Sequence, residues 1–338
     1  MILGVESSCD DTGLALLDEQ QWQFLYERTS TQSDLHATYG GIVPQLAARE
    51  HLRNFPMLLR NLEQHIPLKS ITQIAVTCGP GLPESLALGI SFARSLGLIL
   101  RQAVTGIHHL RGHIMSPFIG HAYTKEDFRK KIFPHLSLLV SGGNTLLAAM
   151  RSNFEIHVLA QTTDDAAGEA LDKGAKLLGL NYPGGPEIER FAALGDQKRF
   201  KFPQAFIEKK AMAFSFSGLK TSLRYMLEKL STDALKGQFN DICASYQWAI
   251  IDILIKKMKQ ALIRGNFRSI GLCGGVSNNG LLRSRLQELA AAHSIPYYLP
   301  QARYTGDNAS MIAFAAAIDF AHSAEAIDFY PNWPLSTP

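Results

Sequence analysis

The 338-residue chain is poor in cysteine, with four residues spread along its length: Cys9, Cys78, Cys243 and Cys273. No two of them form a Cys-x-x-Cys pair, which is typical of zinc ribbons and redox motifs, and two lie in apolar runs that predict buried strands. The pattern therefore favours free thiols in a reducing compartment over a disulfide framework or a cysteine-based zinc site.

The chain also lacks a large charge imbalance and a long uninterrupted apolar run. The formal net charge is +3 and 19% of the residues are charged, which permits an RNA partner without indicating one. The longest apolar stretch, near residues 85–100, is interrupted by Arg94, and no basic region precedes the expected first strand at residues 2–6. We therefore expect no membrane-spanning segment, no signal peptide and a cytoplasmic location.

The chain is long and apolar enough, with 46% hydrophobic residues, to build two domains. We expect an N-terminal half at residues 1–119, a polar linker at 120–132 and a C-terminal half at 133–306 with a helical insertion around 186–240. A helix at 308–322 is expected to pack back on the N-terminal half.

Two more segments near the C-terminus have clear patterns. Apolar residues at helical spacing predict a long amphipathic helix from Ile242 to Ile263. The tail Phe329–Pro338 contains three prolines and is expected to be loosely attached.

Both halves begin with a short strand, a small polar turn and a second strand, at residues 2–17 and 136–150. Hydroxyl and backbone N–H groups of such turns can bind phosphate oxygens, and Asp10 and Asp11 can hold a magnesium ion or its waters. Each turn alone is equally explained as an ordinary hairpin. The repeat indicates two duplicated α/β halves, whose turns face one nucleotide in a cleft between them.

Two glycine-rich loops follow other expected strands. Gly79–Pro83 precedes a helix, whose free N–H groups can bind an anion, although Glu84 would repel a phosphate there. In Gly274–Asn279 the paired glycines allow the backbone to approach a flat ligand closely. With Asn279 beside them, this loop is a candidate adenosine site.

His109 and His113 lie four residues apart in an expected helix, so both side chains share one face. Two imidazoles on one face can share a divalent metal ion, and Asp307, just before the last apolar helix, is the best candidate for a third ligand. Two histidines and one carboxylate suit iron(II) or zinc. On spacing alone, the pair is also explained as two ordinary helix residues.

The segment 197–229 carries eight lysines and arginines against two glutamates, with five phenylalanines between them. Basic and aromatic side chains together are typical of RNA-contacting surfaces. A solvated surface around packed phenylalanines explains the same pattern.

Taken together, these motifs resemble the TsaD family of tRNA threonylcarbamoyltransferases along nearly the whole chain. The segments that carry the resemblance are Glu6–Thr12, Tyr39–Pro44, Gly79–Leu82, His108–His113, Val140–Thr145, Asp164–Glu169, Tyr182–Pro186, Phe214–Thr221, Gly274–Asn279 and Asp307–Asn308. The resemblance implies an actin/Hsp70/sugar-kinase-like (ASKHA) fold, in which two duplicated α/β halves enclose a nucleotide cleft.

The resemblance also implies the chemistry. The family transfers the threonylcarbamoyl group from threonylcarbamoyl-AMP to N6 of adenosine 37 in tRNAs that read codons beginning with A. It implies one divalent metal per subunit, Fe²⁺ in first place and Zn²⁺ as the alternative, with His109, His113 and Asp307 as ligands. The cleft would hold the adenylate or ATP, with or without Mg²⁺, and Asp10 or Asp11 is the candidate general base.

Eight further residues are implied to line the nucleotide and substrate site: Leu139, Val140, Ser141, Gly142, Gly143, Asp172, Gly185 and Asn279. The chain departs from the family pattern at Glu84, Arg111 and Asn144, where a small residue, an acid and a histidine are more common. We therefore assign no proton transfer to Asn144, and Glu84 argues against anion binding at its turn.

Three other functions compete with this interpretation. A zinc peptidase needs a glutamate directly after the first histidine, and Leu110 stands there. An ATP-dependent phosphotransferase shares the fold but needs no such metal ligands, and a non-catalytic scaffold would not need them either.

By resemblance, the expected partners are tRNA, a TsaB-like paralogue, a TsaE-like ATPase and a separate synthase that supplies the adenylate. No membrane partner is expected. The helices expected near residues 44–65 and 83–100 are the candidate surface for a protein partner.

Overall fold

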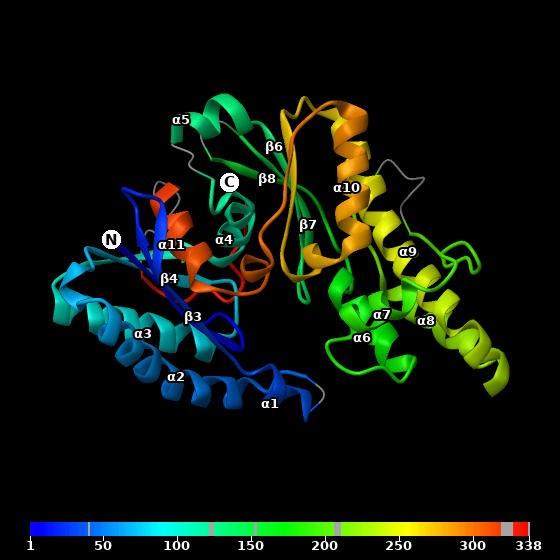
Figure 1. Ribbon diagram of the computed structural model, residues 1–338, viewed down its shortest axis with the longest axis horizontal. Coiled ribbons are helices and arrows are strands. Elements are labelled where there is room, and N and C mark those ends of the chain that lie inside the picture. Colours follow the sequence, from blue (N-terminus) through cyan, green and yellow to red (C-terminus); the bar gives the residue numbers. More distant parts are fainter. Residues whose placement is uncertain (40, 122–124, 152–153, 206–210, 319–326, 337–338) are drawn as a thin grey trace. The chain divides into compact units, whose positions relative to one another are not determined.

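The computed structural model describes residues 1–39, 41–121, 125–151, 154–205, 211–318 and 327–336 (Figure 1). The chain divides into two compact units: unit 1 comprises Met1–Phe128 and Pro300–Pro338, and unit 2 comprises Arg129–Leu299. Unit 2 is thus inserted, in sequence, between the two segments that build unit 1.

Unit 1 contains a five-stranded mixed sheet with the order β3-β2-β1-β4-β5. Its strands are β1 (Ile2–Glu6), β2 (Asp11–Asp18), β3 (Gln23–Thr31), β4 (Gln73–Gly79) and β5 (Ala103–His108). The hairpin strands β1, β2 and β3 are antiparallel neighbours, whereas β1, β4 and β5 run parallel. The carboxyl ends of the three parallel strands therefore meet at one edge of the sheet.

Helices cover both faces of this sheet (Figure 1). Leu3 and Val5 of β1 point to α2 and α3, which lie side by side, and Gly4 points to α11 on the other face. The helices of unit 1 are α1 (Ser33–Ala37), α2 (Pro44–His65), α3 (Pro83–Leu100), α4 (His109–Met115), α5 (Lys125–Asp127) and α11 (Ala309–Ile318), with 3₁₀ turns at Leu68–Ser70, Ser116–Phe118 and Ala302–Tyr304.

Two glycines allow α11 to approach the sheet closely. A Cβ atom at Gly4 would lie 2.2 Å from the carbonyl oxygen of Ala309, and one at Gly13 would lie 3.0 Å from its backbone nitrogen. The first turn of α11 therefore rests directly on β1 and β2, and this contact fixes the position of the preceding residues, including Asp307.

Helix α3 is long and apolar enough to span a membrane, although Arg94 interrupts it. By length and composition alone, the expectation that no stretch of the chain is of this kind was therefore wrong. One helix of this kind is weak evidence for a membrane, because core helices pass the same test. The side of α3 that packs in the core of unit 1 consists of Ser85, Leu86, Gly89, Ile90, Ala93, Leu96 and Gly97.

The C-terminal tail is held on unit 1, contrary to the expectation of loose attachment. The Tyr330 N–H group donates to the Cys78 carbonyl oxygen (2.7 Å), and the Gly81 N–H group donates to the Pro331 carbonyl oxygen (3.2 Å). The Trp333 ring packs on the ring of His108, with 4.7 Å between centroids, and its carbonyl oxygen lies 3.2 Å from His108 Nε2. The tail thus covers the ends of β4 and β5.

Trp333→Ala is expected to lower the free energy of unfolding by about 1–3 kcal/mol, because the half-buried ring loses its contacts with His108 and Tyr330. Urea unfolding measures the effect, and hydrogen exchange should place it in β4 and β5. Phe329→Ala, in the same tail but with its side chain more exposed, is the control and should change little. Equal effects of the two variants would contradict the packing role of Trp333.

Unit 2 repeats the sheet pattern of unit 1. Its order, β10-β9-β6-β7-β8, pairs β6 with β7 and β7 with β8 in antiparallel fashion, and β6 with β9 and β9 with β10 in parallel fashion. The strands are β6 (His135–Val140), β7 (Thr145–Met150), β8 (Ile156–Gln161), β9 (Ser269–Cys273) and β10 (Tyr297–Tyr298). The duplicated α/β architecture expected from the sequence is confirmed.

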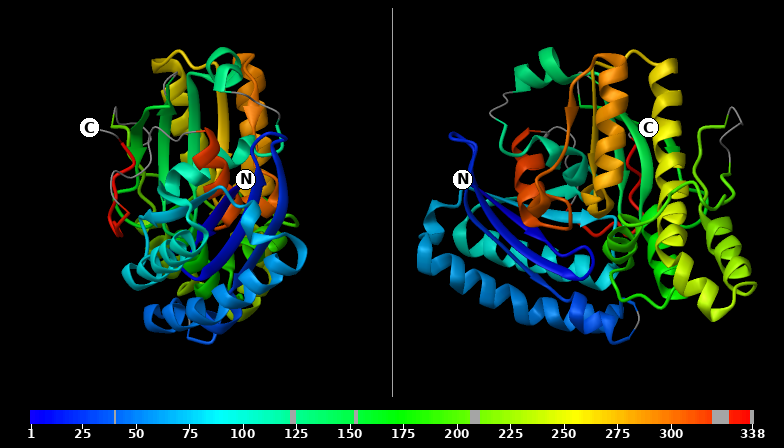
Figure 2. Two further views of the ribbon diagram at one scale, coloured as in Figure 1. Left: turned by 90° about the vertical axis from the view of Figure 1, so that its left-hand side faces the viewer. Right: turned by 45° about the vertical axis from the view of Figure 1, so that its right-hand side comes forward.

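The longest helix of unit 2, α9, forms its helical core. It lies beside α10, and both contact the sheet, while α6, α7 and α8 also pack on α9 (Figure 2). These helices are α6 (Ala167–Leu177), α7 (Gly184–Ala192), α8 (Ser217–Leu227), α9 (Thr232–Arg264) and α10 (Gly280–His293), with a π turn at Phe128–Ile132 and a 3₁₀ turn at Gly275–Asn278. Helix α9 begins ten residues before the expected Ile242, because Ser231 caps it through the Ala234 N–H group.

His135 makes unit 2 sensitive to acid. It is fully buried in β6, and burial lowers its pKa to about 3, from about 6.5 in an unfolded chain. Between these values the unfolded chain binds the extra proton, so stability falls as pH drops below 6.5. We expect this residue alone to cost about 2 kcal/mol between pH 7 and pH 5.

Urea unfolding at several pH values measures this loss. In His135→Asn the amide can still donate to the Ser269 hydroxyl, which lies 2.7 Å from His135 Nδ1, but it cannot be protonated. The variant should therefore show a shallower loss of stability than wild type. Parallel pH profiles for the two proteins would contradict the prediction.

Candidate metal centre

The two histidines are placed by the direct passage of β5 into α4. His108 ends β5 and caps α4, because its Nδ1 atom accepts a hydrogen bond from the Leu110 N–H group at 3.1 Å. His109 and His113 then lie one turn apart and are both buried. The expected helical pair is therefore present.

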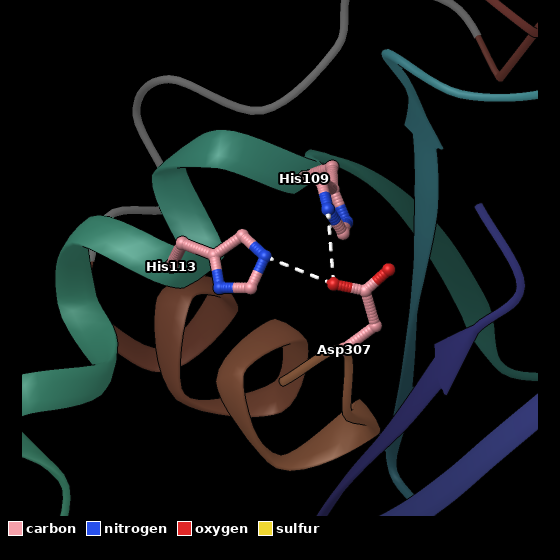
Figure 3. A group of neighbouring side chains, drawn as sticks. All are labelled: His109, His113 and Asp307. Carbon is pink, nitrogen blue, oxygen red and sulfur yellow. Dashed lines mark hydrogen bonds and ion pairs between the residues drawn. The ribbon is translucent and has the colours of Figure 1, made fainter. Parts of the chain in front are cut away.

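Asp307, from the segment before α11, completes the group (Figure 3). Its Oδ1 atom lies 3.0 Å from His113 Nε2 and 3.5 Å from His109 Nε2. One oxygen thus faces both rings, and one potential ligand atom from each residue lies within 4.8 Å of the other two. The structure brings together the three residues named as metal ligands from the sequence.

The group fits a divalent transition metal. Bonds of about 2.1 Å separate neighbouring ligand atoms by about 3.0 Å in an octahedron and about 3.4 Å in a tetrahedron, close to the two observed N···O distances. The Nδ1 atom of His113 is buried without a hydrogen-bond partner among the described residues, so this ring is not held by a wider hydrogen-bond network. Two imidazoles and one carboxylate can hold Fe²⁺ or Zn²⁺ and leave positions open.

The charges of the group are tightly linked. Burial disfavours a charged His109, but the carboxylates of Asp307 and Glu6 outweigh burial and raise its pKa to about 9. Burial alone would raise the pKa of Asp307, yet the neighbouring His109 and His113 hold it well below its usual range. The carboxylate is therefore ionised, which is the state that binds a metal.

Asp11, at the start of β2, is the second notable carboxyl group of unit 1. Its Oδ1 atom is buried and has no hydrogen-bond partner among the described residues. Burial raises its pKa to about 7, with a further contribution from the charge of Asp307. The charge of Asp10 raises this pKa as well, and a value near 7 is the one expected of a base that works near neutral pH.

In unit 2, the glycine-rich loops lie together at the carboxyl ends of β6 and β9. A Cβ atom at Gly274 would lie 2.4 Å from the Val140 carbonyl oxygen, and one at Gly168 would lie 2.5 Å from that of Ser141. Gly142 and Gly143 are exposed and face open space. The turn is therefore open at these two glycines, as the phosphate-turn prediction requires.

The side chains of the other predicted nucleotide residues are less accessible. Leu139 and Val140 are fully buried, so only their backbone can face a ligand. Asp172 Oδ1 accepts from the Gly184 N–H group (2.8 Å), next to Gly185. The buried Asn279 amide accepts from Leu282 N–H and donates to Gln247, both at 3.0 Å. Nucleotide binding by these residues stays a prediction.

The phenylalanines of the basic segment are largely packed inside unit 2. Phe202, Phe214 and Phe216 are buried, whereas Phe206, Lys209 and Lys210 lie outside the described residues. The buried rings cannot stack on bases, so for them the packing explanation applies. Lys201 and Lys220 remain exposed as candidate phosphate contacts.

Sequence reasoning missed Glu6 as part of the metal centre. Its carboxylate is completely buried at the end of β1, and Oε2 lies 3.3 Å from His109 Nδ1. The available signal was an acidic residue at the end of an entirely apolar strand.

Solved structures with the same overall fold define the structural class. HypF from T. kodakarensis aligns with a TM-score of 0.60 at 14% identity, covering 95% of this chain and 47% of that one. The (R)-2-hydroxyglutaryl-CoA dehydratase component A of Acidaminococcus fermentans aligns with a TM-score of 0.52 at 15% identity, covering 95% and 98%. The chain thus has the ASKHA-type fold that was expected from its sequence.

The family follows from sequence comparison. The profile of the TsaD family, described as tRNA N6-adenosine threonylcarbamoyltransferase, matches residues 23–314. Proteins of that name are 41% identical in Thermosipho africanus, over 93% of both chains, and 40% identical in Dichelobacter nodosus, over 99% of this chain and 96% of the relative. The chain belongs to the TsaD family.

Proposed function

We propose that this protein transfers a threonylcarbamoyl group to N6 of adenosine in tRNA. The observation that carries the proposal is the near-full-length similarity to relatives named for this activity. The grouping of His109, His113 and Asp307 supports it, because the alternative phosphotransferase reaction needs no such site. We further propose threonylcarbamoyl-AMP as the donor and adenosine 37 of tRNAs that read codons beginning with A as the acceptor.

The reaction is an acyl transfer. A bond forms between adenine N6 and the carbamoyl carbon, the bond from that carbon to the phosphate oxygen breaks, and AMP leaves. A metal held by His109, His113 and Asp307 would supply Lewis acidity toward the carbamoyl oxygen. We assign Asp11 the proton from N6, since its raised pKa suits it to act as a base near pH 7.

We assign the metal as Fe²⁺, with Zn²⁺ as the alternative, since two histidines and a carboxylate suit both ions. The exposed amides of Gly142 and Gly143 would hold the phosphate of the adenylate or of ATP, with or without Mg²⁺. Because adenine N6 is a weak nucleophile, holding it next to the activated carbonyl should supply much of the rate.

We further propose that a TsaB-like paralogue binds to α2 and α3 of unit 1, and that a TsaE-like ATPase and a separate adenylate synthase complete the system. Large apolar side chains are exposed on both helices: Leu52, Met57, Leu98 and Ile99. Such side chains favour a protein partner. Leu52→Glu and Leu98→Glu should each weaken binding of the paralogue at least tenfold in calorimetry, and unchanged affinity would contradict this surface.

The test of the function is tRNA modification in vitro. The purified protein, its partners and threonylcarbamoyl-AMP are incubated with a tRNA that reads codons beginning with A, and with a matched tRNA whose position 37 is not adenosine. Nucleoside mass spectrometry should detect modified adenosine in the first tRNA alone. ATP-dependent phosphorylation without threonylcarbamoyl transfer would favour the phosphotransferase.

A further inference from the structure

Glu6 is a completely buried carboxylate in contact with one of the three residues of the metal centre. It ends β1, and the parallel pairing of β1 with β4 places it beside Thr77. His109 follows β5, the next parallel strand. The carboxyl ends of three adjacent strands thus bring Glu6, Thr77 and His109 together.

The carboxylate is held by more than the histidine. Oε2 accepts from the Thr77 hydroxyl at 2.6 Å, and Oε1 accepts from the Ser8 N–H group at 2.6 Å. Both anchors are buried. These two hydrogen bonds fix the Glu6 carboxylate without any contribution from His109. The carboxylate can therefore determine the orientation of the imidazole ring.

His109 uses its two nitrogens in different directions. Nδ1 faces Glu6 Oε2 at 3.3 Å and the Ser8 hydroxyl at 3.2 Å, whereas Nε2 faces Asp307. A proton on Nδ1 that is donated to the carboxylate leaves the lone pair of Nε2 directed at the metal position. Carboxylates in this role orient metal-binding histidines and make them more basic ligands.

We propose that Glu6 is a positioning residue, which fixes the orientation and the Nδ1–H tautomer of His109 so that Nε2 can bind the metal. The inference rests on the metal centre of the proposed function. The two histidines then differ, because Glu6 orients His109 whereas His113 Nδ1 has no hydrogen-bond partner among the described residues. The ring of His109 is fixed, and the ring of His113 can adjust to the ion.

The test measures metal binding by the full-length protein, without tRNA or partners. Co²⁺ is titrated into metal-free protein and followed by its visible absorption, and Zn²⁺ affinity is obtained by competition. Glu6→Gln keeps the shape of the side chain but removes its charge. It should lower the affinity for both ions by about 10–100-fold and alter the Co²⁺ spectrum. Tyr26→Phe, which removes a buried hydroxyl bonded to Leu58 and Asn61, is the matched control and should bind as wild type.

Two further variants keep the test decisive if Glu6→Gln is poorly folded. Thr77→Val removes one anchor of the carboxylate without touching His109, and Ser8→Ala removes only the neutral hydroxyl near Nδ1. Thr77→Val should weaken Co²⁺ binding several-fold and alter its spectrum, and Ser8→Ala should have the smallest effect. Urea unfolding of each metal-free variant checks that the fold is retained.

If folded Glu6→Gln binds Co²⁺ with the affinity and spectrum of wild type, Glu6 does not position His109. If Glu6→Gln does not fold, the same result in Thr77→Val has the same meaning. Either result would overturn the role of Glu6 but not the metal centre itself. If His113→Ala binds Co²⁺ with the same affinity as wild type, the metal does not bind at this centre. That result would overturn the metal centre and the role of Glu6 with it. tRNA modification by the wild-type protein is measured separately, so failure of the positioning role is distinguishable from failure of the proposed reaction.

Discussion

His113→Ala is expected to weaken Co²⁺ or Zn²⁺ binding by more than about 100-fold and to reduce tRNA modification to background. Loss of groups that only support metal ligands already costs about 10–100-fold, so loss of a ligand should cost more. His113 is the cleaner of the two histidines to remove. Replacing His109 would also leave the buried Glu6 carboxylate without its imidazole partner.

Metal content after dialysis and the yield of modified adenosine measure the two effects. His293→Ala is the matched control, because that histidine is exposed at the end of α10 in unit 2, and it should keep full activity. Full modification by His113→Ala would retain the transferase function but reduce the histidine to a structural residue.

Asp11→Asn is expected to lower the single-turnover rate of tRNA modification by about 10²–10⁴-fold, the usual contribution of a general base. With a pKa of about 7, the wild-type carboxyl group gains a proton as pH falls and then cannot accept another. The wild-type rate should therefore fall about tenfold per pH unit below pH 7, and the residual rate of the variant should not follow this titration.

Rates between pH 5.5 and pH 8, with saturating threonylcarbamoyl-AMP, measure this dependence. Asp10→Asn separates the two adjacent acids and should change the rate only a few-fold at pH 7.5. A large loss in Asp10→Asn with little loss in Asp11→Asn would transfer the role of base to Asp10. Identical pH profiles for Asp11→Asn and wild type would remove the role from Asp11.

The sequence predicted those parts of the structure that depend on local spacing or on ordered motifs. Residues four apart share a helix face wherever the helix lies, so the pairing of His109 with His113 was accessible. Asp307 was named as the third ligand from its place before the last apolar helix and again by resemblance, but no local rule predicts its contact with His113, 194 residues away. The duplicated sheets followed from two similar strand–turn–strand units.

The missed features depend on tertiary contacts. The acidic end of an apolar strand is the one local sign of Glu6, and it does not reveal the role, which comes from the pairing of β1 with β4. The tail contains prolines, which suggested a loose end, yet its hydrogen-bond partners lie at the end of β4. The first ten residues of α9 contribute none of its buried side chains, so the apolar stripe alone placed the start of the helix at Ile242.

The insertion of unit 2 within unit 1 has a consequence for synthesis on the ribosome. Asp307 emerges 194 residues after His113, roughly 10–40 s later at ordinary translation rates. During that interval β1 lacks α11, and the nascent histidines lack their carboxylate. The candidate metal centre is therefore complete only after translation is nearly finished, and until then the face of β1 at Gly4 is open to chaperones.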